Sequence, residues 1–289
     1  MTTDADPVWS AWPGERFELG EGLRYWQHRL LFVDILSGRL FELPDDADHA
    51  PRMVAELPEP LGAVAPLAGG GWIAAAGTGV GVLGDDGRLR WIARPEEGAA
   101  FRMRMNDAVA DPHGRFWAGS MAYDGAPGAG SLYRLDADGS LHRALEGLTV
   151  PNGPAFSADG ATMYLADSAR GVIHRYAVDE DTGELGGPTE FATLSSGSPD
   201  GMTVDAEGFL WSAVWGAGRV CRFAPDGTLD RVVPVPAVQP TSVCLTGDRL
   251  VVTSARIGLD DPGDSDGAVL STPLDQLGVP ACVATVAGG

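Results

Sequence analysis

A short hairpin-like phrase recurs along the sequence at a nearly constant interval. Its clearest copy is residues 200–211, in which two apolar runs flank a turn from Asp205 to Gly208. Each copy starts at an equivalent position, and in the clearest copies a glycine stands eight residues later. The six leading residues are Glu21, Gly62, Asn106, Asn152, Asp200 and Thr241. They are 41 to 48 residues apart, so one structural unit is repeated six times.

A repeat of this length with about four short strands is typical of a β-propeller. Further strands and turns lie between the copies, such as the apolar run 132–135 before the turn at 136–139. Helical periodicity of useful length is absent from the sequence. We therefore predict an all-β fold, a six-bladed β-propeller. A sandwich or a stack of sheets is the alternative, and the fixed register of the six copies argues against it.

The length of the chain, 289 residues with 40 glycines and 21 prolines, fits one all-β domain with many turns. We predict that residues 1–14 are a loose N-terminal lead-in and that residues 15–289 form a single propeller domain. A ring must close, so we expect Phe17–Leu19 to pair beside either Ala268–Ser271 or Ala281–Ala284. That pairing would join both ends of the chain in one blade and leave fewer open strand edges.

Composition excludes several classes of partner. The net charge is −20 and no Lys/Arg cluster appears, so we expect no nucleic-acid binding and interpret the acidity as a solvated surface. No apolar run approaches the length of a membrane helix, and the start lacks the features of a signal peptide. We therefore expect a cytoplasmic protein without membrane contact. Three cysteines without Cys-x-x-Cys spacing indicate neither a disulfide framework nor a thiolate zinc site.

The leading residues of the repeat have a chemistry in common. In a propeller the first strand of each blade lines the central channel, so residues at one register point to one level. Two carboxylates, Glu21 and Asp200, would meet two carboxamides, Asn106 and Asn152. Buried carboxylates without partners either take up a proton or bind a cation. Oxygen ligands suit Ca²⁺, Mg²⁺ or Mn²⁺, and Zn²⁺ or Fe²⁺ are also accepted. We predict one divalent cation in the channel and leave its identity open.

Each of these residues also has a plainer interpretation. Asn152 and Asp200 are each followed by glycine, and such dipeptides are common in tight turns. Asn106 would then be a capped strand entry, and Glu21 a surface acid. The shared register makes four independent coincidences the weaker explanation, so we favour a site.

With these residues identified, the sequence resembles the senescence marker protein, gluconolactonase and regucalcin family. The matching phrases include Arg104–Asp107, the stretch 111–121, Asn152–Gly153 and Asp200–Met202, and the likeness covers roughly residues 15–275. That family is a six-bladed propeller with one catalytic divalent cation in its channel. Leu23 and Tyr25 depart from the Pro and Trp usual in the family, and we expect them to reshape the channel mouth near Glu21.

The resemblance implies a role for each matching residue. Glu21, Asn152 and Asp200 would be the protein ligands of the metal. Arg104 and Asn106 would bind substrate, and Asp124 falls where the family often has an acid that contacts a sugar hydroxyl. The implied activity is hydrolysis of sugar lactones, aldonolactones such as glucono- or pentonolactones. The cation would polarise the lactone carbonyl, and Asp200 would take a proton from the attacking water.

Three other functions stay open. A phosphotriesterase or fluorophosphatase would use the same metal site, and an apolar channel mouth would favour it. A calcium-binding propeller would bind the cation without turnover, and a protein-interaction scaffold would bind no metal. Arg104 and Asp124 favour a small, polar, sugar-like substrate. The sequence does not indicate which lactone is used or the oligomeric state.

Overall fold

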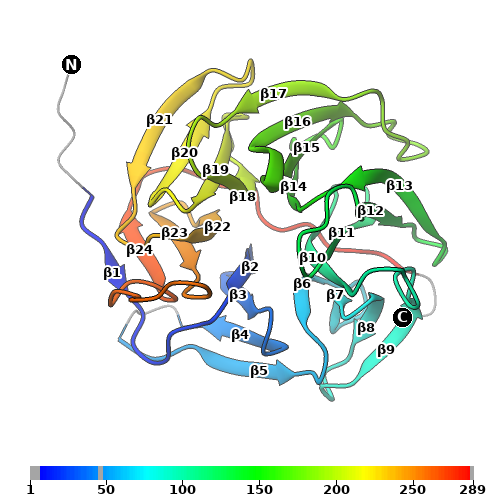
Figure 1. Cartoon of the computed structure of the whole chain (residues 1–289), viewed down its shortest axis with the longest axis horizontal. Coiled ribbons are helices and arrows are strands. Elements are labelled where there is room, and N and C mark those ends of the chain that lie inside the picture. The colour runs from blue at the N-terminus through cyan, green and yellow to red at the C-terminus, as the bar shows by residue number, and fades with distance from the viewer. Residues whose placement is uncertain (1–6, 45–47, 287–289) are drawn as a thin grey trace.

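A computed structural model of the protein describes residues 7–44 and 48–286. Within this part of the chain the regular structure is almost entirely β, with one short 3₁₀ turn, η1 (Ser168–Arg170). Six antiparallel sheets of four strands each surround a central channel (Figure 1). The structure therefore confirms the prediction of an all-β, six-bladed propeller. The described residues contain no helix long and apolar enough to cross a membrane.

Each blade consists of four strands that are numbered from the channel outward, except that the sixth blade takes its outer strand from the start of the chain. The strands of blades one to three are β2 (Gly20–Trp26), β3 (Arg29–Asp34), β4 (Arg39–Leu43), β5 (Arg52–Glu56), β6 (Leu61–Pro66), β7 (Trp72–Ala76), β8 (Gly79–Leu83), β9 (Leu89–Ala93), β10 (Met103–Ala110), β11 (Phe116–Ala122), β12 (Gly130–Leu135) and β13 (Leu141–Leu148). Those of blades four to six are β14 (Pro151–Phe156), β15 (Thr162–Asp167), β16 (Val172–Ala177), β17 (Thr189–Thr193), β18 (Ser198–Val204), β19 (Leu210–Trp215), β20 (Arg219–Phe223), β21 (Leu229–Pro234), β22 (Pro240–Leu245), β23 (Arg249–Ser254), β24 (Val269–Pro273) and β1 (Ser10–Ala11).

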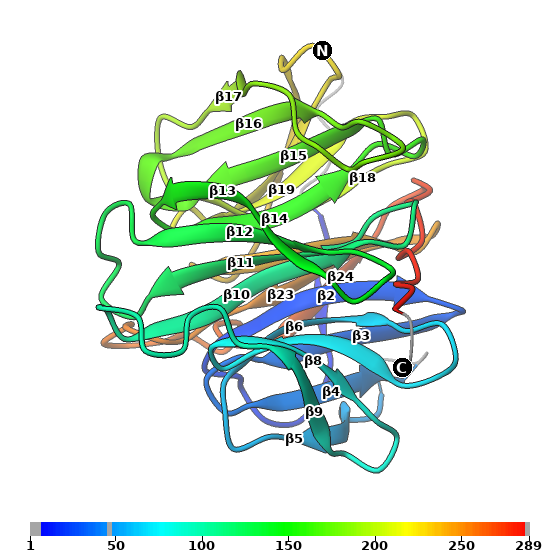
Figure 2. The ribbon, with the colours of Figure 1, turned by 90° about the vertical axis from the view of Figure 1, so that its right-hand side faces the viewer.

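The innermost strands β2, β6, β10, β14, β18 and β22 contact one another in that order around the channel. They are almost completely buried, whereas the outer strands β13 and β21 are largely exposed. The side view shows the sheets stacked face to face around the ring (Figure 2). The core lies between blades, since Ile73 of blade two and Phe116 of blade three belong to one buried cluster. This packing holds the innermost strands, and hence the channel-lining residues, in fixed positions.

The ring closes through the pairing of β1 with β24, in which Ser10 lies opposite Ser271. The prediction that both ends of the chain share one blade is confirmed, but the predicted strand Phe17–Leu19 is wrong. Phe17 packs edge-on against Phe32 in the core, with ring centroids 4.8 Å apart. The closing strand instead comes from the stretch expected to be a lead-in, because two residues are too few to show strand alternation in a sequence.

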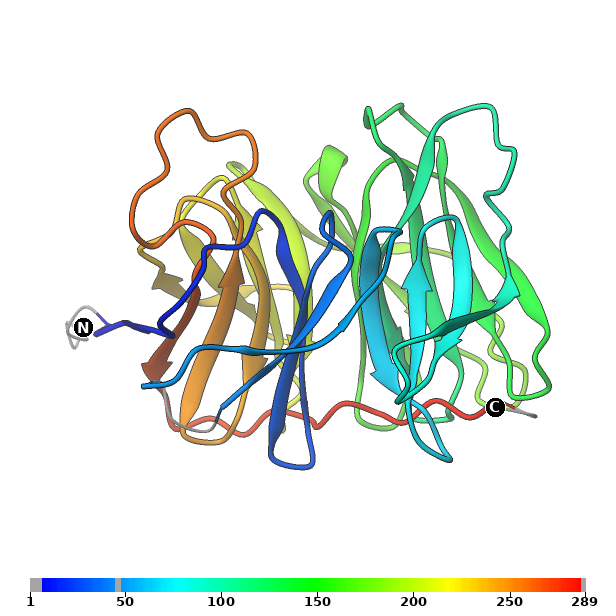
Figure 3. The ribbon, with the colours of Figure 1, turned by 90° about the horizontal axis from the view of Figure 1, so that it is seen from below.

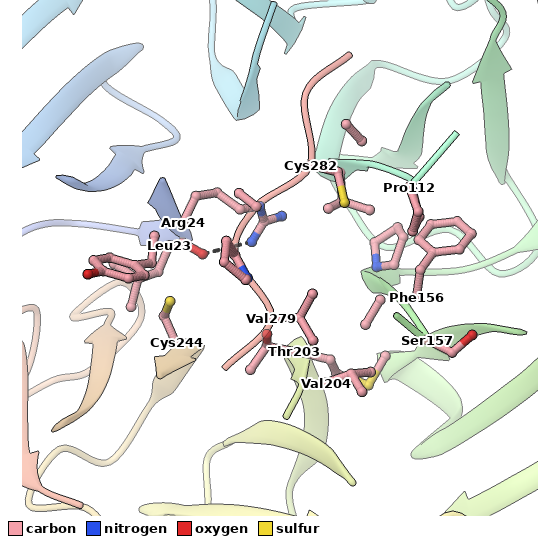
Figure 4. A pocket seen from close by; sticks show the side chains of 18 residues that line it. Leu23, Arg24, Pro112, Phe156, Ser157, Thr203, Val204, Cys244, Val279 and Cys282 are labelled. Atoms are coloured by element: carbon pink, nitrogen blue, oxygen red, sulfur yellow. Dashed lines mark hydrogen bonds between the residues drawn. The ribbon is translucent and has the colours of Figure 1, made fainter. Parts of the chain in front are cut away.

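The C-terminal segment 274–286 does not join a blade, although residues 281–284 were one expected closing strand. It crosses one end of the ring, away from the loop at 257–267 (Figure 3). Backbone hydrogen bonds attach it to five blades. They run from Leu274 N to Asp248 O (2.9 Å), Val279 N to Val204 O (3.2 Å), Ala281 N to Tyr25 O (2.9 Å), Ala284 N to Pro66 O (2.8 Å) and Thr285 N to Gly114 O (2.8 Å). Figure 4 shows Val279 and Cys282 of this strap beside Leu23, Arg24 and Cys244. The strap covers the end of the channel at which the innermost strands finish.

Candidate functional site

Every innermost strand is irregular at the position where the repeated register falls. The pairing register shifts between Glu21 and Arg24 in β2, and equivalent shifts occur in the five other innermost strands. A β-bulge turns a side chain out of the ordinary alternation and is common beside active sites. The six leading residues predicted from the sequence therefore lie at or beside six bulges, on one level of the channel.

Small residues at these bulges let the strands approach one another closely. A Cβ atom added at Gly62 would lie 2.2 Å from the carbonyl oxygen of Asn106, and one at Gly153 would lie 2.7 Å from the nitrogen of Met202. Gly153 also has a φ of 49°, which favours glycine. In the sixth blade the hydroxyl of Thr241 donates to the carbonyl of Gly20. Gly62 and Thr241 thus serve the packing of neighbouring blades. The other four leading residues, Glu21, Asn106, Asn152 and Asp200, present acidic or amide side chains to the channel.

Two acidic side chains meet in the channel. Glu21 and Asp200 are each 4% exposed. Burial raises the pKa of both carboxyls well above the ordinary value, and the negative charge of Asp200 raises the pKa of Glu21 further. The charge of Asp107 acts in the same direction on both groups. The Oδ1 atom of Asp200 has no hydrogen-bond partner among the described residues. The protein therefore leaves part of the hydrogen-bonding capacity of this carboxyl pair unused.

A chain of hydrogen bonds orients the amide of Asn152. Arg104 Nη1 donates to Asn106 Oδ1 (2.6 Å), and Asn106 Nδ2 donates to Asn152 Oδ1 (2.7 Å). Asn152 Nδ2 donates in turn to Ser168 Oγ (2.9 Å), whose hydroxyl donates to the carbonyl of Pro199 (2.5 Å). Because the Nδ2 atom of Asn152 donates to Ser168, the Oδ1 atom of Asn152 must face Asn106. That oxygen accepts one hydrogen bond and keeps a second lone pair.

The three predicted metal ligands fit a hard divalent cation. Glu21, Asn152 and Asp200 all present oxygen, and one oxygen of Asp200 is buried without a partner. A cation would also remove the electrostatic conflict between the two carboxylates. The described residues contain no group of three or more His, Cys, Asp or Glu side chains placed to bind a metal. The predicted set has two such residues, with an amide as its third member.

These residues line one cavity of about 480 Å³, a size typical of small-molecule sites. Glu21, Arg104, Asn106, Asn152 and Asp200 all contribute to its wall, so the structure brings five of the six predicted site residues together. The cavity lies where the innermost strands begin, at the end of the channel opposite the strap. Burial lowers the pKa of the Arg104 guanidinium, which is among the buried charged residues.

Asp124 lies apart from the other five. It is exposed in the loop between β11 and β12, where its Oδ1 accepts a hydrogen bond from the backbone nitrogen of Ala126 (3.1 Å). It is not among the residues that line the cavity. A role for Asp124 in substrate binding therefore stays a prediction.

Several cavity residues were missed by the sequence analysis. Ser168 begins η1 and completes the hydrogen-bond chain of Asn152. Leu19, Ile35, Trp215 and Ile257 contribute apolar wall. All five lie outside the repeated register, at strand ends or in the segments between strands. The sequence therefore gave no periodic signal for them.

Comparison with known proteins identifies the family. Residues 19–256 match the family model described as the SMP-30/gluconolactonase/LRE-like region. The chain belongs to this family. A 6-deoxy-6-sulfogluconolactonase from Pseudomonas putida is 34% identical, over 98% of this chain and 94% of that protein. A pentonolactonase from Haloferax volcanii is 34% identical, over 91% of this chain and 93% of its own.

A solved structure of a family relative agrees with the fold. The structure described as a calcium-binding protein, regucalcin, from Agrobacterium tumefaciens superposes with a TM-score of 0.89 at 29% identity. The match covers 96% of this chain and 97% of that one. The resemblance seen in the sequence is thus confirmed.

The two departures from the family pattern are not among the residues that line the cavity. Leu23 and Tyr25 contact the strap at the other end of the channel, and the backbone oxygen of Tyr25 accepts the hydrogen bond from Ala281. The expectation that they reshape the mouth near Glu21 is wrong. Residues that lie two and four positions along β2 from Glu21 are carried toward the opposite end of the strand.

Proposed function

We propose that this protein is a metal-dependent hydrolase that opens sugar lactones to aldonic acids. The observation that carries the proposal is the buried Glu21–Asp200 pair, with its unpartnered Asp200 oxygen, beside the oriented amide of Asn152. The pair lies in a cavity that also contains Arg104. The relatives named as lactonases in Pseudomonas putida and Haloferax volcanii support this activity. A small-molecule lactone is then the partner of the site.

Glu21, Asn152 and Asp200 would hold the cation, which as a Lewis acid would polarise the lactone carbonyl. Ser168 and Asn106 keep the amide of Asn152 in the orientation that presents its oxygen. Loss of such outer contacts commonly lowers metal affinity by about 10- to 100-fold. The cation among Ca²⁺, Mg²⁺, Mn²⁺, Zn²⁺ and Fe²⁺ is identified by the reconstitution described below.

Arg104 and Asp200 supply the remaining chemistry. Within the described residues, Arg104 uses Nη1 to bind Asn106 Oδ1 and the carbonyl of Met105 (3.0 Å). Its other N–H groups are left to bind a lactone hydroxyl or carbonyl oxygen. Asp200 would bind the cation through one carboxylate oxygen, and its other oxygen would accept the proton of the attacking water. The buried setting excludes bulk water from this transfer.

The test is turnover of a panel of aldonolactones by chelated protein that is refilled in turn with each of the five cations. Hydrolysis releases an acid, so a pH indicator follows it after the spontaneous rate is subtracted. We expect one cation to restore turnover on one or two lactones, and the Asp200→Asn variant to remain inactive. A flat panel with one cation still bound per chain would indicate a cation-binding propeller instead. Absence of turnover on every lactone, together with absence of bound cation, would show that the predicted cation site does not exist.

One observation favours a second activity on the same site. Part of the cavity wall is apolar, formed by Leu19, Ile35, Trp215 and Ile257, and such a wall suits the alkyl groups of phosphotriesters. Hydrolysis of diisopropyl fluorophosphate, followed by fluoride release with the reconstituted enzyme, tests it. Fluoride release faster than opening of every lactone would make fluorophosphate hydrolysis the main activity.

A further inference from the structure

A buried ion pair joins two blades across the channel, on the strap side of the cavity. Arg24 of β2 is 7% exposed, and Asp107 of β10 is 1% exposed. Arg24 Nη2 donates to Asp107 Oδ1 (2.9 Å) and to the carbonyl oxygen of Ala108 (2.6 Å). Its Nη1 donates to the carbonyl oxygen of Leu23 (2.9 Å), and Figure 4 shows this side chain reaching from β2 into the ring. The guanidinium therefore connects blade one directly to blade three.

The pair lies between two cavities of the channel. On β2, Glu21 lines the cavity of the candidate site, and Arg24 lines the smaller strap-side pocket. On β10, Asn106 lines the first and Val109 lines the second. Among the residues that the structure describes, the two cavities have no lining residue in common, and Asp107 lines neither. Since the charge of Asp107 is already paired with Arg24, we do not count Asp107 among the cation ligands.

Both ends of the pair adjoin a β-bulge that presents a site residue. The pairing register of β2 shifts between Glu21 and Arg24, and that of β10 shifts just before Ala108. Arg24 is therefore the first regularly paired residue after the bulge of Glu21. On β10 its partners are Asp107, which lies in the bulge next to Asn106, and Ala108, which ends that bulge. One guanidinium thus ties the bulge of Glu21 to the bulge of Asn106.

The pair is poorly built for stability alone. Arg24 Nε and Asp107 Oδ2 are buried without a hydrogen-bond partner among the described residues. A buried ion pair commonly adds little net stability because both charges lose their hydration, and unpartnered polar atoms add to that cost. The rigid fork of a guanidinium, in contrast, holds its partners in one geometry. The positions that the pair imposes on the two bulges explain its presence better than stability does.

Two observations connect these positions to the cation ligands. Asn106 Nδ2 donates to Asn152 Oδ1 (2.7 Å), so the placement of the β10 bulge determines where the amide of Asn152 is held. Burial is the main cause that raises the pKa of Glu21 and of Asp200, and the charge of Asp107 raises both pKa values further. Asp107 is thus close enough to act on both site acids. A displaced β10 bulge would therefore alter the surroundings of all three ligands.

We propose that Arg24 is a positioning residue of the cation site. It holds the bulges of Glu21 and Asn106 in a fixed relation across the channel, so that Glu21 and Asn152 face the same cation. This inference rests on the cation site of the proposed function and deepens it. The sign of the effect is diagnostic. Loss of a positive charge near a cation would by itself strengthen cation binding, whereas loss of the link between the bulges weakens it.

The test is Arg24→Met in the Asp107→Asn background. The Asp107→Asn substitution comes first because an amide oxygen still accepts from Arg24, and no buried charge is stranded when Arg24 is then replaced. Ca²⁺ and Mn²⁺ are each titrated calorimetrically into chelated Asp107→Asn and Asp107→Asn/Arg24→Met. We expect the second substitution to weaken binding by about 10- to 100-fold. Unchanged or tighter binding would overturn the proposal.

The matched control is Arg222→Met in the Asp205→Asn background. Arg222 is 6% exposed and pairs with the buried Asp205 (2.7 Å) in blade five. Both double variants are expected to unfold at a lower urea concentration than the wild type, because each loses the contacts of a buried arginine. Only the replacement of Arg24 is expected to weaken cation binding. An equal loss of affinity in the control pair would trace the effect to general destabilisation and overturn the proposal.

Hydrogen exchange of the chelated proteins separates this inference from the proposed function. Without Arg24 the β10 bulge loses its link to β2, so the backbone amides of residues 105–108 should exchange about 10-fold faster in Asp107→Asn/Arg24→Met than in Asp107→Asn. The control pair should show equal exchange in this segment. Faster exchange at the bulge supports the positioning role even if the wild type binds no cation, and in that event only the proposed function fails. Equal exchange in the Arg24 pair would overturn the inference.

Discussion

Two buried aspartates of one hairpin, Asp200 and Asp205, have opposite surroundings. Asp205 follows β18 and is 1% exposed. Its Oδ1 accepts the backbone N–H of Phe209 (2.9 Å), and its Oδ2 accepts the indole N–H of Trp211 (2.8 Å) and Nε of Arg222 (2.9 Å). Both oxygens of this carboxylate thus accept hydrogen bonds that hold the turn between two strands. Asp205 is therefore a structural residue.

Asp200, five residues earlier, is just as buried but lacks such partners. Its Oδ1 is unpaired among the described residues, and its neighbour is a second acid, Glu21. The arrangement of Asp205 recurs in blade three, where Asp111 Oδ2 accepts Arg115 Nε (2.7 Å) and Trp117 Nε1 (2.9 Å). The comparison teaches that burial of an acid does not reveal its role. Whether the protein completes its hydrogen bonds separates Asp200 from the turn acids Asp205 and Asp111.

The largest effect is expected from Asp200→Asn. Lactone turnover should fall by about 10²- to 10⁴-fold, because the variant lacks the proton acceptor and a charged ligand. The chelated variant should unfold at a temperature no lower than the wild type, since the substitution removes a buried charge next to Glu21. Steady-state kinetics and thermal unfolding measure the two quantities. Retained turnover with unchanged metal content would contradict the role given to Asp200.

Asp205→Asn should show the reverse behaviour. We expect the free energy of unfolding to fall by about 3 kcal/mol, because an asparagine cannot accept from both Trp211 and Arg222 as a carboxylate does. The kcat/KM of the folded fraction should stay within about two-fold of the wild type. Urea unfolding and kinetics on the same preparation give both numbers. A variant with lost turnover and full stability would show that the distinction between the two aspartates is wrong.

Cation binding should stabilise the protein only where the site acids are intact. At a concentration of 100 times its dissociation constant, the cation should raise the free energy of unfolding by about 2.7 kcal/mol. The same addition should leave Asp200→Asn nearly unchanged, while Asp205→Asn should gain as much as the wild type. Thermal unfolding with and without cation measures the gain. An equal gain in all three proteins would place the cation elsewhere.

The smallest effect is expected from Ser168→Ala. Removing the hydroxyl frees the Nδ2 atom of Asn152, so the amide is no longer fixed, and cation affinity should fall by about 10- to 100-fold. Ser157→Ala, in the first turn of the same blade, is the matched control because its hydroxyl bonds only within that turn. A cation titration of both variants gives the comparison. Equal affinities would mean that Asn152 is held by Asn106 alone.

The repeat made most of this architecture predictable. Its period indicates six blades, and its leading residues include Glu21, Asn106, Asn152 and Asp200, which the structure brings into one cavity. The leading residues could be aligned from the sequence because each copy of the repeat forms the innermost strand of a blade. The bulges that turn these side chains inward were not predicted, although the glycines that permit them, such as Gly153, are visible in the sequence.

Features outside the repeat could not be predicted in the same way. The closing strand Ser10–Ala11 is too short to show alternation. The strap has the apolar composition of a strand, but its backbone hydrogen bonds are distributed over five blades. The apolar wall of Trp215 and Ile257 comes from residues 42 positions apart in different blades, and only tertiary structure brings them together. Ser168 was missed because its partner, Asn152, lies on the neighbouring strand.

The most direct test of the central claim is calorimetric titration of divalent cations into chelated wild type, Asp200→Asn and Asp205→Asn. The claim is that Asp200, which has an unsatisfied oxygen, binds the cation, and that Asp205, whose oxygens are both hydrogen-bonded, does not. We predict one cation per chain in the wild type and in Asp205→Asn, with equal affinity, and at least 100-fold weaker binding in Asp200→Asn. Wild-type affinity in Asp200→Asn, or no binding by the wild type, would contradict the account.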